Sequence, residues 1–168
     1  GFETLKLALL RSDVMIVAIC DIDEVAAAKA SNAVLDAGHA KPKLFTDGNE
    51  AYKKMLDKKE LDAVMICTPW EWHTPMSVAS MNASIAVACE VAGAMSVDEC
   101  WHLVRTYEQT KTPFMIMENV CYRRDVMAIL NMVRKDMFGE MIHLEGGYQH
   151  DLREVKFNDG VNYYGGGV

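Results

Sequence analysis

Residues 61–73 read Leu-Asp-Ala-Val-Met-Ile-Cys-Thr-Pro-Trp-Glu-Trp-His. The apolar run at the start of this stretch is typical of a buried parallel strand. Pro69 ends the run, because proline fixes φ and has no N–H to donate to a sheet. In open α/β sheets, ligands bind at the carboxyl ends of the strands. Two tryptophans and a histidine at that position therefore indicate either a binding site or the packed start of the next helix.

Helices and strands alternate along the rest of the chain. The apolar periodicity and the turn residues predict helices over 3–11, 24–37, 49–58, 75–82, 97–110 and 124–137, and strands over 14–20, 43–45, 62–67, 85–89, 114–117 and 142–148. Ser96, with Glu99 three residues later, predicts a capping box at the start of the helix over 97–110. Strands and helices at this spacing form βαβ units and a parallel sheet. We therefore expect an α/β fold of the Rossmann type, followed after residue 120 by the start of an α+β domain.

The first part of such a fold is missing from the pattern. A dinucleotide-binding sheet begins with a strand and a glycine-rich turn, whose backbone N–H groups face the pyrophosphate. Gly1 already lies in the helix that should follow this turn. In the usual strand order 3-2-1-4-5-6 the missing strand is central. We therefore expect a sheet that is interrupted in its middle, and a chain that is a fragment of a larger protein and inactive alone.

Composition and charge exclude several classes of protein. The 24 acidic and 17 basic residues give a net charge of −7, which argues against binding to nucleic acid or to an anionic membrane. No apolar run approaches the ~20 residues that cross a bilayer. The first residues show no leader pattern, so we leave the localisation open between the cytoplasm and export to a bacterial periplasm.

The five cysteines are odd in number and contain no CxxC pair. Cys20, Cys67 and Cys89 each close an apolar run, so we expect small buried thiols and no disulfide framework. The histidines are too scattered in the sequence to predict a metal site.

Polar residues follow several of the predicted strands. Asp21 ends the strand over 14–20, where an acidic side chain can bind the adenosine ribose hydroxyls, while Asp23 is placed to cap the next helix. Glu90 and Asn119 follow two later strands at the same sheet edge, as a cofactor crevice requires. The alternatives are a solvated loop acid for Glu90 and a helix cap for Asn119.

A second polar cluster consists of Tyr148, Gln149, His150 and Asp151. A histidine beside a carboxylate and a phenol can perform acid–base chemistry on a hydroxyl group. The alternative is a solvated edge of a sheet.

These motifs resemble a known family. Asp21 after its strand, Thr68-Pro69 with a histidine shortly after, a Cys-Glu strand end and Asn119 resemble the Gfo/Idh/MocA oxidoreductases. Three longer runs resemble glycoside hydrolase family 109, whose members are NAD-dependent α-N-acetylgalactosaminidases: Trp-Glu-Trp-His-Thr-Pro-Met (70–76), Glu-Asn-Val-Cys-Tyr-Arg-Arg-Asp (118–125) and Gly-Tyr-Gln-His-Asp-Leu-Arg-Glu-Val-Lys-Phe-Asn (147–158). The resemblance covers essentially the whole chain.

The resemblance implies a set of site residues. It implies NAD contacts at Asp21, Trp70, Glu71, Trp72, His73, Glu90, Val91 and Asn119, and a sugar contact at Tyr148. It also implies that residues 1–120 are a partial NAD-binding Rossmann domain and that residues 121–168 begin an α+β substrate or oligomerisation domain. We take His150 and Tyr148 as the candidate catalytic residues that handle protons, because they cluster.

The implied reaction is hydrolysis by way of redox chemistry. NAD takes a hydride from sugar C3, loss of the C2 proton then expels the C1 substituent, water adds, and the hydride returns. The expected partner is a glycan with N-acetylgalactosamine, and a homo-oligomer is possible. Glu90-Val91-Ala92 replaces the Glu-Lys-Pro of the oxidoreductases, which argues against the alternative of a sugar dehydrogenase. A non-catalytic NAD- or sugar-binding fragment is the other alternative.

Overall fold

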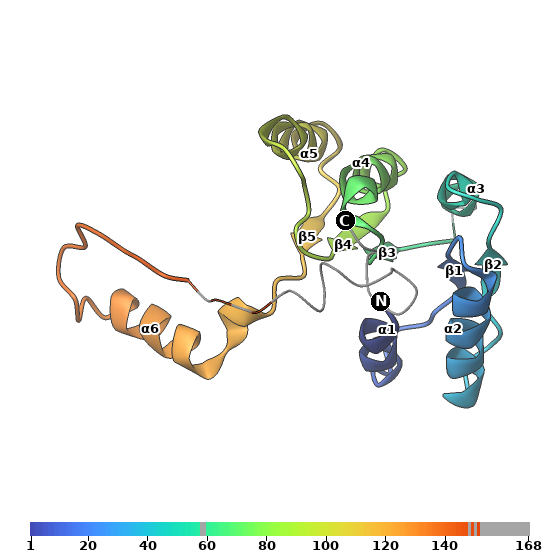
Figure 1. Cartoon of the computed structure of the whole chain (residues 1–168), viewed down its shortest axis with the longest axis horizontal. Coiled ribbons are helices and arrows are strands. Elements are labelled where there is room, and N and C mark those ends of the chain that lie inside the picture. The colour runs from blue at the N-terminus through green and yellow to red at the C-terminus, as the bar shows by residue number, and fades with distance from the viewer. Residues whose placement is uncertain (58–59, 148, 150, 152–168) are drawn as a thin grey trace. The chain divides into compact units, whose positions relative to one another are not determined.

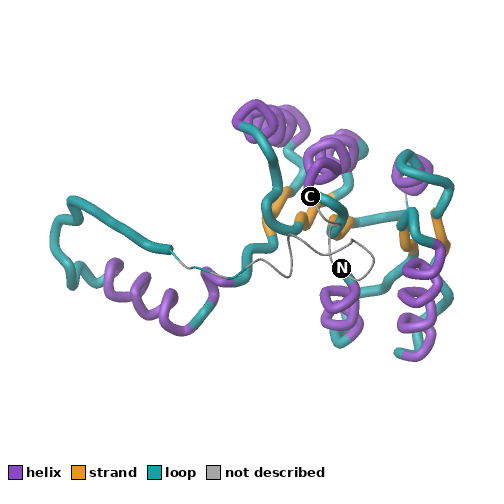
Figure 2. Tube along the Cα trace, in the orientation of Figure 1, coloured by secondary structure: helices purple, strands orange, loops and turns teal. Residues whose placement is uncertain are grey.

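The computed structural model describes residues 1–57, 60–147, 149 and 151, and it contains the predicted helices in the predicted order (Figures 1 and 2). The chain divides into two compact units, Gly1–Ile116 and Met117–Val168. The assignment of residues 1–120 and 121–168 to two functional domains stays a prediction.

The first unit is an α/β structure with parallel strands. Its elements are α1 (Phe2–Leu9), β1 (Ala18–Cys20), α2 (Glu24–Asp36), β2 (Lys43–Phe45), α3 (Ala51–Leu56), β3 (Ala63–Ile66), the 3-10 turn η1 (Trp70–Trp72), α4 (His73–Asn82), β4 (Ala86–Cys89), α5 (Val97–Thr110) and β5 (Phe114–Ile116). β1 pairs with β2, β3 with β4, and β4 with β5, and all three pairings are parallel. The predicted fold class is therefore confirmed.

The described strands form two sheets, of order β1-β2 and β3-β4-β5. β1 is shorter than the predicted strand over 14–20, because the ladder that it forms with β2 runs only from Ala18 to Cys20. Among the described residues no ladder joins β1 to β3, so the sheet is interrupted between these two strands, as expected.

Helices lie on both faces of the strands in this unit, with α3, α4 and α5 on one face and α1 and α2 on the other (Figure 1). The core lies under α3, α4 and α5. In β3, Val64 and Ile66 face this core, while Met65 points to the opposite face and is 42% exposed. The strand is therefore buried on one face only, although its apolar run is typical of a strand that is buried on both.

Local signals at the helix starts are confirmed. The Asp23 carboxylate caps α2 by accepting from the backbone N–H of Val25 at 2.8 Å. Ser96 Oγ accepts from the N–H of Glu99 at 3.2 Å, and Glu99 Oε2 accepts from the N–H of Met95 at 2.6 Å. The N–H groups of a first helical turn lack partners within the helix, and Asp23 and Ser96 provide them, whereas Glu99 reaches back to the residue before the N-cap.

The second unit contains η2 (Val120–Tyr122) and the amphipathic helix α6 (Arg124–Arg134). The strand predicted over 142–148 is wrong over its described part, since residues 142–147 are not in a strand. A strand needs a neighbour for its backbone hydrogen bonds, and apolar alternation alone does not supply one. No described helix combines the length and the apolar character needed to cross a membrane.

Candidate cofactor site

Asp21 follows β1 directly and is exposed. One of its carboxylate oxygens, Oδ1, accepts from the backbone N–H of Asp23 at 2.9 Å. This bond orients the Asp21 carboxylate at the end of the strand, and Asp23 takes the separate task of capping α2. Asp23 is therefore the helix cap, and Asp21 remains the candidate for the ribose contact.

The start of α1 lies against the ends of β3 and β4. A Cβ on Gly1 would lie 3.2 Å from Cβ of Cys67, so a larger residue here would require Cys67 to shift slightly. Thr4 Oγ1 donates to Glu90 Oε1 at 3.4 Å. In dinucleotide-binding folds a glycine in this position packs the helix on the strand, and the helix amino end attracts phosphate.

Gly1 and Thr4 were not among the predicted site residues. The signal for Gly1 was present, because a glycine at the start of a helix that precedes a strand ending in Asp fits the glycine pattern of this fold. Thr4 had no local signal, because its partner Glu90 lies 86 residues later in the chain.

The turn η1 combines the two roles predicted for it, a binding site and the packed start of a helix. Trp70 is 57% exposed, and Glu71 is also exposed. The Trp72 ring packs edge-on against Tyr52 of α3, with ring centroids 6.3 Å apart, and so joins the core. Trp70 and Glu71 are thus accessible to a ligand, while Trp72 anchors the turn.

His73 is the first residue of α4 and is buried, with 1% of its surface exposed. Its Nε2 lies 2.8 Å from the carbonyl oxygen of Thr68, and its Nδ1 lies 3.3 Å from the backbone nitrogen of Gly93. A carbonyl only accepts and a backbone N–H only donates, so Nε2 carries the proton and Nδ1 does not. Both ring nitrogens are therefore used within the protein, and the predicted NAD contact of His73 stays a prediction.

Glu90 and Val91 follow β4. Glu90 is half-buried and its backbone N–H donates to the carbonyl of Ile66 at 2.9 Å, which extends the pairing of β3 and β4 by one step. Val91 is 43% exposed. Asn119 belongs to the second unit, where it precedes η2 without a side-chain capping bond. Tyr148 and His150 lie outside the described residues, so their predicted roles stay predictions.

The thiols at the strand ends have pKa values above the ordinary value of cysteine. Burial, and then the negative charge of Asp21, raise the pKa of Cys20 to about 11. Burial likewise raises the pKa of Cys89 to about 11 and also raises that of Cys67. These thiols remain protonated near neutral pH, and protonated thiols react slowly.

Two further observations bear on ligands. Thr68 Oγ1, at the end of β3, is buried and has no hydrogen-bond partner among the described residues. Within the same part of the chain, no group of three His, Cys, Asp or Glu side chains is arranged to hold a metal ion.

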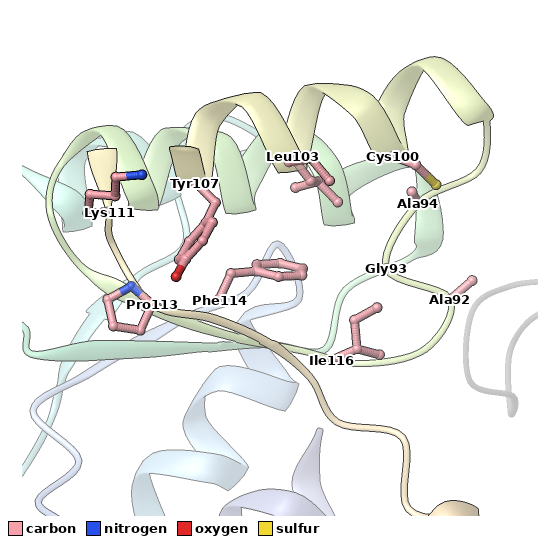
Figure 3. Close-up of a pocket in the computed structure, with 11 residues that line it drawn as sticks. Ala92, Gly93, Ala94, Cys100, Leu103, Tyr107, Lys111, Pro113, Phe114 and Ile116 are labelled. Atoms are coloured by element: carbon pink, nitrogen blue, oxygen red, sulfur yellow. The ribbon is translucent and has the colours of Figure 1, made fainter. Parts of the chain in front are cut away.

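A pocket of about 530 Å³ lies between α5 and the β4–β5 side of the sheet (Figure 3). Leu103 and Tyr107 of α5 face Phe114 and Ile116 of β5 across it. None of the predicted site residues that the structure describes lines it, but Ala92 and Gly93, which follow Val91 in the chain, do.

Two protein families match the chain in succession. An oxidoreductase family with an NAD-binding Rossmann fold matches residues 3–118, and the C-terminal domain of glycosyl hydrolase 109 matches residues 122–168. A glycosyl hydrolase family 109 protein from Stenotrophomonas maltophilia is 48% identical over 162 residues, which cover 95% of this chain and 36% of that protein. An α-N-acetylgalactosaminidase from Tannerella forsythia is 52% identical over 149 residues, which cover 88% of this chain and 32% of that protein.

The fold also matches a solved structure. The crystal structure of myo-inositol 2-dehydrogenase from Lactobacillus plantarum superposes with a TM-score of 0.67 and 23% identity, over 83% of this chain and 40% of that chain. This likeness shows the fold. The chain spans about a third of the length of the curated relatives it matches.

Proposed function

Because the chain belongs to the Gfo/Idh/MocA oxidoreductase family, and within it to glycosyl hydrolase family 109, we propose that it is the NAD-binding part of an α-N-acetylgalactosaminidase. The observation that carries the proposal is the succession of the two matches, in which an NAD-binding fold is followed directly by a glycosidase domain. The name of the relative from Tannerella forsythia supports terminal α-linked N-acetylgalactosamine as the sugar removed.

The described residues fit an NAD molecule at the strand ends. Asp21 presents its carboxylate for the ribose hydroxyls, and the amino end of α1, near the end of β3, suits the pyrophosphate. The Thr68 hydroxyl, which lacks a protein partner among the described residues, suits a ligand that passes the end of β3. When bound, NAD supplies reversible hydride transfer.

The other predicted contacts are assigned as follows. Trp70 and Glu71 contact NAD from the exposed side of η1, with Trp72 as their support. Glu90 and Val91 contact it from the loop after β4, and Asn119 from the segment after β5. The apolar Val91 side chain cannot take up a proton, so proton transfer to and from the sugar needs other groups, for which we retain Tyr148 and His150. Tyr148 also contacts the sugar.

The experiment uses the whole protein with an α-N-acetylgalactosaminide and no added cofactor. We expect release of the sugar without accumulation of NADH, because the hydride returns in each turnover. In deuterated water, the released sugar should carry deuterium at C2, since the C2 proton is lost and replaced. A glycosidase that uses two carboxylates leaves C2 untouched.

Each other outcome points to a different function. Stoichiometric NADH formation would identify a sugar dehydrogenase. The absence of both NADH and free sugar would favour a non-catalytic binding protein. Sugar release with no deuterium at C2 would rule out the redox route.

A further inference from the structure

The first two residues of α4 hold Gly93 by both of its backbone polar groups. His73 Nδ1 accepts from the N–H of Gly93, and Thr74 Oγ1 donates to its carbonyl oxygen, each at 3.3 Å. Gly93 has φ +82°, and a Cβ there would lie 3.2 Å from Cδ1 of Ile116. The loop after β4 is therefore held at one point from two sides.

The same His73 ring reaches the segment after β3. Its Nε2–H donates to the carbonyl of Thr68 at 2.8 Å, the shortest bond that the ring makes. The backbone pairing of β3 and β4 ends at the bond from Glu90 to Ile66. Beyond this point, where no ladder continues, the buried imidazole joins the two chain segments instead.

The segments joined in this way carry proposed NAD contacts. Trp70 and Glu71 lie just after Thr68, and Glu90 and Val91 lie just before Gly93. We propose that His73 is a positioning residue, which sets the spacing between η1 and the loop after β4 and thereby the affinity for NAD. This inference rests on the proposed function, and it replaces a direct contact of the His73 ring nitrogens with the cofactor.

Three substitutions separate the two hydrogen bonds. In His73→Asn, the side-chain oxygen occupies nearly the place of Nδ1 and can still accept from Gly93. In His73→Gln, the amide nitrogen comes near the place of Nε2 and can still donate to Thr68. His73→Leu removes both bonds.

The NAD dissociation constant of each variant, measured by titration of the cofactor-free whole protein, tests the role of the ring. We expect His73→Leu and His73→Gln to bind NAD roughly tenfold more weakly, because the buried N–H of Gly93 is left without an acceptor. His73→Asn should restore most of the affinity.

Met81→Ala is the matched control. Met81 lies in the same helix, is completely buried and packs in the hydrophobic core, and none of the hydrogen bonds to Gly93 described above involves it. This change should lower the melting temperature and leave the NAD affinity unchanged, which separates positioning from a general loss of stability. If the His73 variants do not fold, Thr74→Val removes the other bond to Gly93 and should weaken NAD binding in the same direction.

A direct measurement accompanies the variants. Nitrogen-15 NMR of the histidine-labelled whole protein should show His73 with a protonated Nε2 and an unprotonated Nδ1. The positioning role is wrong if His73 has the opposite tautomer, or if all variants bind NAD as tightly as the native protein. It is also wrong if His73→Asn does not recover NAD affinity. In each of these cases NAD binding by the native protein still stands. If the native protein does not bind NAD, the proposed function itself fails.

Discussion

Asp21 and Asp23 lie two residues apart and have different partners. The backbone N–H of Asp23 orients the Asp21 carboxylate, whereas the Asp23 carboxylate caps α2. His73 shows the same dependence on partners, because two backbone groups occupy both nitrogens of a ring that lies at a strand end. At this scale the chemistry of a residue depends on which of its polar atoms the protein has left available.

Replacement of Asp21 should change the choice of cofactor. A carboxylate accepts from the ribose hydroxyls of NAD and repels the 2′-phosphate of NADP. In Asp21→Ser we expect NAD affinity to fall roughly tenfold, as for loss of a hydrogen bond to a charged group, and the preference for NAD over NADP to disappear. Titration of the whole protein with both cofactors measures this. Asp23→Ser keeps a good cap and should leave the preference unchanged; a loss of preference there would contradict the assignment.

Gly93 and Gly38 form a natural pair for measuring steric restraint. Both have φ +82°, but a Cβ on Gly38 meets nothing within 4 Å, while a Cβ on Gly93 meets Ile116. Gly38→Ala should therefore cost about 1 kcal/mol of unfolding free energy from its backbone conformation alone. Gly93→Ala should cost more, because Ile116 must also move. Urea unfolding of both variants tests the difference, and equal losses would show that the loop yields without resistance.

At the scale of elements, α2, α3, α4 and α5 each follow a strand in the chain. Asp23 and Ser96 accept from backbone N–H groups in the first turns of α2 and α5. α4 begins without a side-chain cap and follows the η1 turn directly. The capped helices thus have an accepting side chain at their own N-cap, whereas the first two residues of α4 are hydrogen-bonded to Gly93 instead.

The capping box of α5 should be measurable. Ser96→Ala removes the acceptor for the N–H of Glu99, so we expect the unfolding free energy to fall by about 1 kcal/mol. Ser96→Asn retains an acceptor at the same position and should recover most of this loss. If Ser96→Ala is as stable as the native protein in urea unfolding, the cap contributes nothing to the stability of α5.

At the scale of the whole molecule, the proposed site is divided between two sheets. Asp21 follows β1 of the β1-β2 sheet, while Glu90 follows β4 of the β3-β4-β5 sheet. No ladder among the described residues connects the two sheets. A cofactor that contacts both residues would therefore lie across the strand ends of both sheets.

Hydrogen exchange should report this position of the cofactor. A ligand that binds only the folded form stabilises the segments that it joins. Adding NAD to the cofactor-free whole protein should slow amide exchange in both β1 and β4. Nicotinamide mononucleotide lacks the adenosine half and should protect β4 without protecting β1. Protection of a single sheet by NAD would contradict the proposed position of the cofactor.

Much of the fold follows from local pattern. The order of helices and strands, the Asp23 and Ser96 caps and the interruption of the sheet were all predictable, because periodicity and capping depend on residues close in sequence. The strand predicted over 142–148 failed for the opposite reason. The apolar residues of 142–147 provide the pattern, but a strand also needs hydrogen bonds to a partner that the pattern does not contain.

The sequence by itself determined the α/β class, the family, and the strand ends at which a cofactor site belongs. Only the tertiary structure decided that the His73 ring is a buried bridge, that Gly1 packs on Cys67, and that Thr4 reaches Glu90. Residues far apart in the chain make two of these contacts, and the third depends on the path of the turn between Thr68 and α4. A side chain at a strand end can bind a ligand or hydrogen-bond to the backbone, and the residue type alone does not distinguish these two roles. The role depends on which hydrogen-bond partners the folded chain places next to that side chain.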